Sequence, residues 1–284
     1  MGVSRGIPDY WPLLTAYHGV REALYRTIIT DARLAADTRI LDAGCGDAFY
    51  SQLLADLLGP GARIVALDHN PDLLRARPNL APSVHLCLSD LAWPGLQRAA
   101  FDAVWLCRTM HSAPDPVGRL AALAPLLRPG GRLIVIENDT AHDPILSLPA
   151  EFERRLREAR VQYEKSRCLD GASPDRYHAA RYLAAWLTQV GLQAVAVRTY
   201  VSEDVAPLDE PAEVYWRALM AWQGVCLMPF LSPADQAAYR RAFDPASPDY
   251  LLSSPGFHCL ELTTVAWGIR PDSGPRADAR PVAT

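Results

Sequence analysis

The sequence has almost no lysine: Lys165 is the only one, and arginine supplies the rest of the positive charge. Its 28 Lys and Arg residues are outnumbered by 32 Asp and Glu residues, which gives a formal net charge of -4. A slightly acidic chain has no general attraction for phosphate backbones or anionic lipids. We therefore expect neither nucleic acid nor a membrane surface as a partner.

Long apolar runs are absent as well, since none approaches the ~18 residues typical of a membrane span. The first ten residues lack the basic-then-apolar layout of a secretory signal. The six cysteines are scattered and form no C-x-x-C pair, which argues against a zinc site or a disulfide framework. These absences predict a cytoplasmic protein that needs no metal.

Short apolar runs alternate with helical patterns through the first half of the chain. This alternation predicts an α/β fold in which a parallel sheet is covered by helices on both faces. We expect strands at residues 39–42, 63–68, 84–88, 101–107 and 132–137. We expect helices between them at residues 50–58, 72–75 and 117–127.

The second half is less regular and richer in proline and aromatic residues. We expect helices at residues 150–165, 175–190, 210–228 and 233–243, and strands at residues 195–200 and 260–269. An apolar stripe in the first 38 residues predicts a further helix there. Aromatic residues of the first helix and of the 202–257 segment are expected to form helix cores, with some left to line an apolar pocket.

The run RILDAGCGDA at residues 39–48 carries the chemistry. An apolar strand leads into Asp42, then into a turn with Gly44 and Gly46, then into a helix. Glycine has no Cβ, so the backbone can turn sharply and approach a ligand closely. The helix behind the turn offers free N–H groups. A helix-capping turn without a ligand would use the same residue types, so the turn alone does not decide.

The turn favours S-adenosylmethionine over a dinucleotide. A dinucleotide fingerprint requires a third glycine, and Phe49 occupies that position. The Phe49 ring would obstruct a pyrophosphate, and the Asp42 charge would repel it. The amino group of adenosylmethionine suits the same carboxylate.

Two further acids follow the next strands. Asp68 ends the second strand, where a carboxylate accepts hydrogen bonds from ribose hydroxyls, although NAD enzymes use the same device. Asp90 follows the third strand and is placed to accept from an adenine amino group. Taken alone, Ser89-Asp90 is also an ordinary strand-to-loop signal.

The segments ILDAGCGDA, IVALDHNPDLL, LSDL, FDAVWLCRTMHSAPDP and LLRPGGRLIVIEN occur in this order. They resemble the class I S-adenosylmethionine-dependent methyltransferases of the ubiquinone/menaquinone-biosynthesis type, also described as methyltransferase type 11-like. The resemblance is close over residues 38–138, and Ala48 stands where the family commonly has a glycine. It implies a Rossmann-like sheet of seven strands with the last strand antiparallel.

This resemblance also sets the expected organisation of the chain. Residues 38–201 would form the cofactor-binding domain, and residues 258–270 its last strand. Residues 1–37 and the insertion at 202–257 would be helical lid segments. Residues 271–284 would be a disordered tail. A homodimer is compatible with this arrangement.

Position in the chain and the resemblance together predict a set of residues for the cofactor site. These residues are Asp42, Gly44, Cys45, Gly46, Asp68, His69, Asp90, Leu91, Cys107, Tyr17 and Arg21. We expect only a backbone contact from Cys107, and a small buried side chain explains that residue equally well. Tyr17 and Arg21 would reach the cofactor carboxylate, with a packed tyrosine and a solvated arginine as the plain alternative.

His111 is the candidate catalytic residue. It lies in the loop after the fourth strand, beside the expected methyl-transfer cleft, and an imidazole can take a proton from a nucleophile. A histidine in this loop is equally compatible with no role in catalysis. His258, just before the last strand, is a weaker candidate.

The resulting hypothesis is methyl transfer from S-adenosylmethionine to a small organic acceptor, by direct displacement on the sulfonium methyl. The aromatic lid and the family analogy favour an aromatic or polyketide-like secondary metabolite as the acceptor. Two alternatives stay open: an adenosylmethionine-dependent cyclisation or decarboxylation, and a non-catalytic binding subunit.

Overall fold

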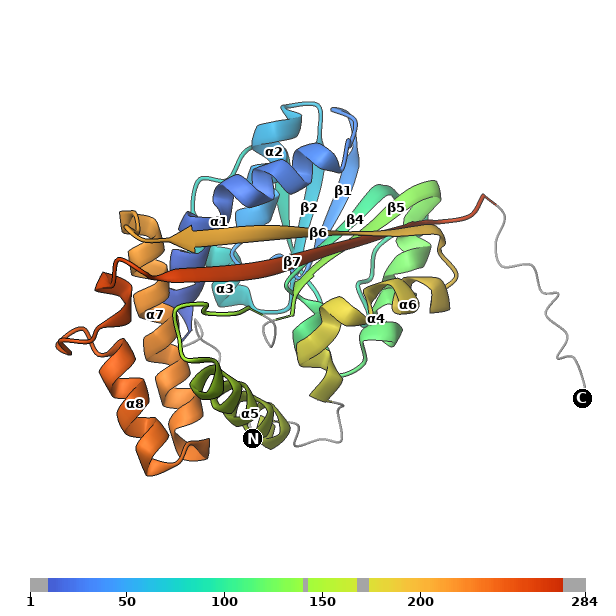
Figure 1. Cartoon of the computed structure of the whole chain (residues 1–284). Helices are drawn as coiled ribbons and strands as arrows, with labels where there is room; N and C mark the ends of the chain where they lie inside the picture. The colour runs from blue at the N-terminus through green and yellow to red at the C-terminus, as the bar shows by residue number, and fades with distance from the viewer. Residues whose placement is uncertain (1–9, 140–142, 168–173, 273–284) are drawn as a thin grey trace, which may run out of the picture. The chain divides into compact units, whose positions relative to one another are not determined.

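The structure is a computed structural model that describes residues 10–139, 143–167 and 174–272 (Figure 1). The chain divides into two compact units. Unit 1 comprises Met1–Arg33, Asn138–Ala180 and Thr199–Thr264, and unit 2 comprises Leu34–Glu137, Arg181–Arg198 and Val265–Thr284. The segment 138–180 thus groups with the N-terminal helix, whereas the sequence analysis assigns it to the cofactor-binding domain.

A seven-stranded sheet has the strand order β3-β2-β1-β4-β5-β7-β6. The strands are β1 (Arg39–Ala43), β2 (Arg63–Asp68), β3 (Val84–Leu88), β4 (Phe101–Cys107), β5 (Leu127–Asn138), β6 (Gln193–Val205) and β7 (His258–Ile269). The pairs β1–β2, β1–β4, β2–β3 and β4–β5 are parallel. The predicted seven-stranded, Rossmann-like sheet is confirmed.

The last strand is antiparallel, as the resemblance implies. Just past the end of β7, the Arg270 amide donates to the Gly131 carbonyl at 2.8 Å, and the Gly130 amide donates back to Arg270 at 2.9 Å. Such reciprocal bonds between facing residues are typical of an antiparallel pair.

The order of the strands reverses between β1 and β4, because the chain builds the sheet from β1 toward β3 and then from β4 toward β5. Open α/β sheets bind ligands at such a switch point, outside the carboxyl ends of the strands. The fold therefore directs attention to the residues that follow β1, β2, β3 and β4.

Local sequence explains the helices of unit 2. These are α2 (Phe49–Leu58), α3 (Pro71–Ala76), α4 (Pro116–Leu123) and α6 (Leu183–Gln189). Asn70 and Asp115 cap α3 and α4 by accepting backbone N–H bonds, and a proline follows each cap. α2 and α3 pack on β2 and β3, and α4 packs with α6.

The core of unit 2 surrounds the central strands. Side chains from both faces of the sheet are fully buried there, among them Ile40, Leu41, Trp105 and Leu106. Central strands that are covered on both faces read as continuous apolar runs rather than as alternating ones. That property made these strands visible in the sequence.

Unit 1 is built from α1 (Trp11–Asp31), α5 (Ala150–Arg167), α7 (Glu210–Leu227), α8 (Pro233–Phe243) and the outer parts of β6 and β7. α7 packs against α1, α5 and α8. Tyr215, Trp216 and Tyr239 are buried, so these aromatic residues form helix core, as predicted. Phe230 is exposed.

Several predicted boundaries are wrong. α4 ends at Leu123 instead of residue 127, because Pro125 lacks the N–H that a continuing helix needs. The helix predicted at 175–190 is a 3₁₀ segment, Pro174–Arg181, followed by α6, and His178 has a non-helical φ of -111°. The N-terminal helix covers only Trp11–Asp31, and most of the predicted tail lies outside the described residues.

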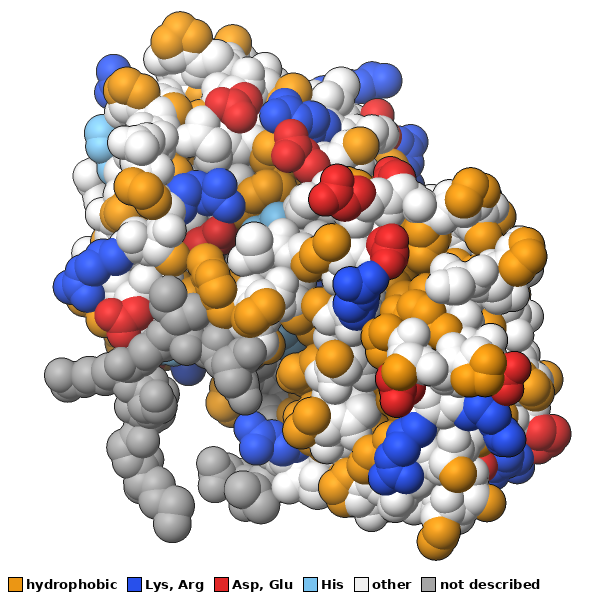
Figure 2. Space-filling model, turned by 90° about the vertical axis from the view of Figure 1, so that its left-hand side faces the viewer, with side chains coloured by type: hydrophobic (Ala, Val, Ile, Leu, Met, Phe, Trp, Pro, Cys, Tyr) orange, Lys and Arg blue, Asp and Glu red, His pale blue; other side chains and the backbone are white. Residues whose placement is uncertain are grey.

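Charge is mixed on the face drawn in Figure 2, where both basic and acidic side chains lie among hydrophobic ones. Within the described part of the chain, no helix combines the length and the hydropathy needed to cross a bilayer.

Candidate cofactor and active site

The turn after β1 needs its glycines for two different reasons. Gly44 has a φ of +78°, and a Cβ at this position would lie 2.8 Å from Thr109 Oγ1. Gly46 has a φ of +57°, but a Cβ there would meet nothing within 4 Å. The backbone at Gly46 therefore borders open space in which a ligand can approach it.

The turn is tied to β2 by several hydrogen bonds. The amides of Gly44 and Cys45 donate to the Leu67 carbonyl at 2.7 and 3.0 Å. The Gly46 amide donates to Asp68 Oδ2 at 2.9 Å, and the Asn70 amide donates to Asp68 Oδ1 at 2.8 Å. Each carboxylate oxygen of Asp68 keeps a further lone pair, which can accept from a ribose hydroxyl.

Asp42 is buried beneath the turn and accepts a hydrogen bond from Ser51 Oγ at 2.6 Å. Burial is the largest cause that raises the pKa of the Asp42 carboxyl, and together with the charges of Asp68 and Asp47 it brings the pKa to about 7, against the opposing effect of the Ser51 hydrogen bond. Asp47 is itself paired with Arg77 at 2.8 Å. Three carboxyl groups therefore gather around the glycine turn, and in their ionised form they favour a ligand that carries positive charge.

The segment after β3 forms a tight turn. Asp90 pairs with Trp93 in an isolated bridge, and Leu91 lies between them. Asp90 Oδ1 accepts from the Ala92 amide at 2.8 Å and from Arg119 at 2.6 Å. The Asp90 side chain is 58% exposed, so its carboxylate is accessible at the surface of the unit.

The other predicted cofactor-binding residues of unit 2 differ in how exposed they are. The His69 side chain is 77% exposed and lies 3.4 Å from Asp68 Oδ1. Cys45 and Cys107 are buried. Burial raises the pKa of the Cys45 thiol, so this cysteine is unreactive rather than nucleophilic.

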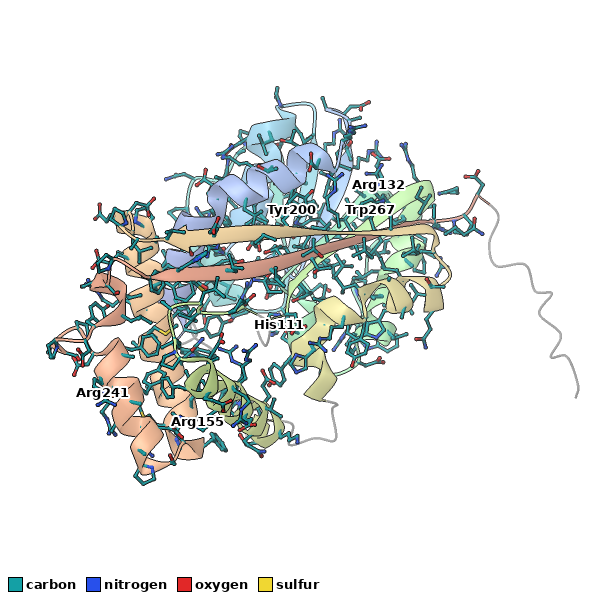
Figure 3. All side chains as sticks on the ribbon, viewed as in Figure 1. His111, Arg132, Arg155, Tyr200, Arg241 and Trp267 are labelled. Carbon is teal, nitrogen blue, oxygen red and sulfur yellow. The ribbon has the colours of Figure 1, made fainter. Side chains whose placement is uncertain are left out.

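His111 lies just beyond the end of β4, in a 3₁₀ turn (Figure 3). His111 Nδ1 is 3.2 Å from Glu137 Oε2, and the Met110 amide donates to Glu137 Oε1 at 2.5 Å. The Glu137 side chain is 2% exposed, whereas the His111 side chain is 40% exposed. A carboxylate beside Nδ1 places the proton of a neutral imidazole there, so Nε2 carries the free lone pair.

Glu137 was not predicted from the sequence as a site residue. Cys107 pairs with Ile136 across β4 and β5, and this register brings Glu137 beside the loop that follows Cys107. An acid at the end of the strand after the histidine loop was the available signal, but the register that connects the two is a tertiary property.

The structure brings most predicted residues of unit 2 to one edge of the sheet. The glycine turn, Asp68, Asp90 and His111 follow four strands that are neighbours in the sheet, β1, β2, β3 and β4. The open backbone at Gly46 and the acceptor oxygens of Asp68 and Asp90 fit a nucleoside that carries hydroxyl and amino donors. Within the described residues, no three His, Cys, Asp or Glu side chains form a group that could hold a metal.

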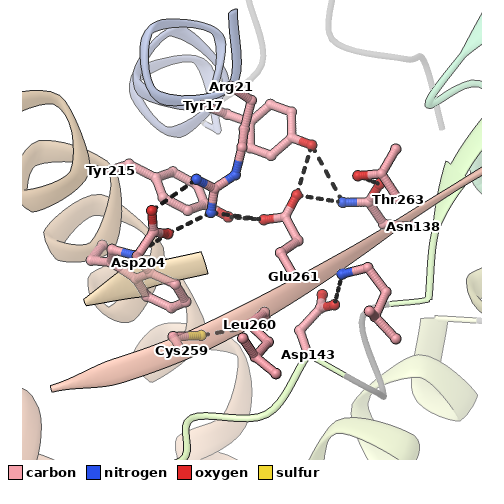
Figure 4. Close-up of polar contacts among 12 residues, drawn as sticks. Tyr17, Arg21, Asn138, Asp143, Asp204, Tyr215, Cys259, Leu260, Glu261 and Thr263 are labelled. Carbon is pink, nitrogen blue, oxygen red and sulfur yellow. Dashed lines mark hydrogen bonds and ion pairs between the residues drawn. The ribbon is translucent and has the colours of Figure 1, made fainter. Parts of the chain in front are cut away.

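Tyr17 and Arg21 belong to unit 1, where both side chains are buried (Figure 4). Arg21 donates to both oxygens of Asp204, at 3.0 and 2.6 Å. Tyr17 and Asn138 both donate to Glu261 Oε1 at 2.8 Å. Arg21 is therefore not the solvated arginine of the plain alternative, and its cofactor contact stays a prediction.

His258 also belongs to unit 1. His258 Nε2 lies 2.6 Å from Glu203 Oε1, so this nitrogen is engaged by a carboxylate.

Comparisons with known proteins concern the same part of the chain. Residues 41–133 match the family model described as a methyltransferase domain. The ubiquinone biosynthesis O-methyltransferase of Xanthomonas axonopodis pv. citri (strain 306) is 32% identical over 167 residues. That match covers 56% of this chain and 64% of the relative, so the chain spans less than two thirds of the relative's length.

Two solved structures are similar in fold. One is a candidate methyltransferase of Bacillus halodurans C-125, with a TM-score of 0.53, 13% identity, and coverage of 87% of this chain and 98% of that one. The other is the YcgJ protein of Bacillus subtilis, with a TM-score of 0.50, 12% identity, and coverage of 89% and 100%. Residues 41–133 are thus similar in sequence to a methyltransferase domain, and the chain shares the seven-stranded, Rossmann-like fold of these two solved structures.

Proposed function

We propose that this protein transfers a methyl group from S-adenosylmethionine to a hydroxyl oxygen of a small aromatic acceptor. The observation that carries the proposal is the hydrogen bond between the Gly46 amide and Asp68. It joins the open backbone of the glycine turn to a carboxylate with spare acceptor capacity, within the segment that matches the methyltransferase domain.

The chain's own residues have distinct roles toward the cofactor. The Gly44–Gly46 backbone lets the ligand approach β1, and Asp68 accepts from the ribose hydroxyls. Asp42 and its neighbouring carboxylates favour the positive charge of the cofactor. Bound adenosylmethionine supplies the methyl carbon, and its positively charged sulfur is the leaving group.

His111 acts as the general base in this proposal. Its Nε2 would take the proton of the acceptor hydroxyl and so make the acceptor oxygen a better nucleophile. Glu137 holds the imidazole through Nδ1, and its buried negative charge stabilises the imidazolium that results. General-base catalysis by a positioned side chain is typically worth about 10²–10⁴-fold in rate.

Support for oxygen as the acceptor atom comes from the Xanthomonas relative, which is named an O-methyltransferase. We propose oxygen as the acceptor atom for this chain too. The predicted secondary metabolite is the class of acceptor to test first. We keep the prediction that residues 1–37 and 202–257 are lid segments. α1 packs against α7, so parts of the two predicted lid segments belong to one compact unit.

The test is incubation of the purified protein with methyl-labelled S-adenosylmethionine and a panel of phenols, aromatic polyketides and quinol precursors, followed by mass spectrometry. The expected result is a product with one labelled methyl group on oxygen, together with S-adenosylhomocysteine. An unlabelled, cyclised or decarboxylated product would support the non-methylating alternative. Calorimetry that detects no binding of S-adenosylhomocysteine would overturn the proposal.

A further inference from the structure

An ion pair connects the segment after β3 to the helix after β4. Arg119 lies on α4, and its Nη1 is 2.6 Å from Asp90 Oδ1. In the sheet, β2 and β1 lie between β3 and β4. The pair therefore spans the carboxyl ends of the two strands that carry Asp68 and the glycine turn.

The two carboxylate oxygens of Asp90 differ in their hydrogen bonds. Oδ1 accepts from both Arg119 and the Ala92 amide. Oδ2 has no hydrogen bond to any described residue of the chain. One oxygen of the carboxylate is thus fixed by the protein, and the other is left as an acceptor at the same edge of the sheet.

Arg119 is itself held in place by its helix. Asp115 caps α4 by accepting the Gly118 amide at 2.8 Å, and the Arg119 amide donates to the Asp115 carbonyl at 3.1 Å. The Arg119 side chain is 23% exposed, so it is better shielded from water than its partner. A short capped helix thus presents the guanidinium to Asp90.

We propose that Arg119 is a positioning residue of the adenosine site. Its ion pair with Asp90, called the clasp below, holds Asp90 across the strand ends and directs Asp90 Oδ2 toward the exocyclic amino group of the adenine. This inference rests on the proposed function. It adds a residue that touches the cofactor site only through another residue.

The clasp has a consequence for base selectivity. An ionised carboxylate only accepts hydrogen bonds, so it suits the amino group of adenine. Hypoxanthine has a carbonyl oxygen in place of that amino group, and two acceptors would face each other. The Ala92 amide and the positive charge of Arg119 lower the pKa of Asp90, which keeps the carboxylate ionised. The pair therefore favours adenosyl over inosyl ligands.

The experiment is calorimetric measurement of Kd for S-adenosylhomocysteine and S-inosylhomocysteine. The proteins are the wild type, Arg119→Ala, Arg119→Lys, Asp90→Asn and the double variant Arg119→Ala with Asp90→Asn. Arg128→Ala is the matched control, because Arg128 forms a similar pair with Asp102 at 2.7 Å that involves none of the site residues. Thermal unfolding confirms that each variant folds.

For Arg119→Ala we expect affinity for the adenosyl ligand to fall about 3- to 10-fold, a modest factor because the pair is partly exposed. The preference of Arg119→Ala for the adenosyl over the inosyl ligand should be smaller than that of the wild type. Both the affinity and the preference of Arg119→Lys should lie between those of the wild type and Arg119→Ala. In the Asp90→Asn background the loss of Arg119 should add nothing, and Arg128→Ala should change neither Kd.

An unchanged adenosyl-to-inosyl ratio in Arg119→Ala would overturn the clasp while leaving the proposed function standing. An equal loss from Arg119→Ala in both Asp90 backgrounds would do the same. A wild-type protein that binds neither ligand would overturn the proposed function itself, and the clasp with it.

Discussion

Glu137 Oε2 lies 3.2 Å from His111 Nδ1, and the carboxylate is buried whereas the imidazole is partly exposed. His111 follows β4, and Glu137 lies near the end of the neighbouring parallel strand β5, so the sheet itself holds them together. This pairing turns an isolated loop histidine into an oriented one, with Nε2 directed away from its partner.

The first prediction concerns this pair. His111→Gln should lower the rate of methyl transfer by about 10²–10⁴-fold, because the acceptor hydroxyl loses its base. Glu137→Gln should lower the rate less, since an amide still accepts from Nδ1 but does not stabilise an imidazolium. Single-turnover rates measured across pH check both variants.

S-adenosylhomocysteine affinity should change little in either variant, which separates catalysis from cofactor binding. His258→Gln is the control, because it removes the other candidate base. A rate that falls with His258→Gln and not with His111→Gln would refute the assignment.

The second prediction concerns Asp42 and pH. Burial raises the pKa of Asp42 from 3.8 to about 7 in the folded protein. Between these values the folded state binds more protons than the unfolded state, so the free energy of unfolding should fall as pH rises from about 4 to about 7. Above that range the contribution of Asp42 should be constant.

Asp42→Asn should remove this part of the slope, because the amide does not titrate and its oxygen still accepts from Ser51. Urea unfolding of both proteins at several pH values from 4 to 8 provides the comparison. Parallel pH profiles for the wild type and the variant would show that Asp42 is not the titrating group.

The third prediction distinguishes the two glycines of the turn. Gly46→Ala should cost about 1–2 kcal/mol of unfolding free energy, because only the left-handed backbone conformation opposes it. Gly44→Ala should cost more, since its Cβ also meets the side chain of Thr109. Urea unfolding of the two variants measures the difference, and equal losses would contradict the geometry at Gly44.

The fourth prediction concerns the buried ion pair of unit 1. Arg21→Ala leaves Asp204 and Glu261 without their cation, and breaking a buried pair in this way typically costs about 3–5 kcal/mol. Arg26→Ala is the matched control on the same helix, because Arg26 pairs with Glu22 at the surface. It should cost at most about 0.5 kcal/mol.

Urea unfolding gives both values, and calorimetry with S-adenosylhomocysteine adds a second readout for Arg21→Ala. A loss of stability similar to that of Arg26→Ala would show that the network is not what stabilises unit 1. A loss of ligand affinity in a stably folded variant would support the predicted contact of Arg21 with the cofactor.

The sequence by itself determined the features that depend on neighbouring residues. Strands 63–68, 84–88 and 101–107 were predicted at their observed bounds, because apolar runs bounded by turn residues are local signals. The glycine turn was equally visible, since its backbone conformation excludes most other residues. Because Asp68 and Asp90 each come at the end of a predicted strand, the sequence also predicted both of them as cofactor-binding residues.

Only the tertiary structure decided which residues meet. His111 and Glu137 are 26 residues apart, Asp90 and Arg119 are 29 apart, and Arg21 and Asp204 are 183 apart. No periodicity connects such pairs, because the order and register of the strands and the packing of α1 bring them together. Arg21 shows the same limit, since its place on a helix was predictable whereas its partners depend on β6 and β7.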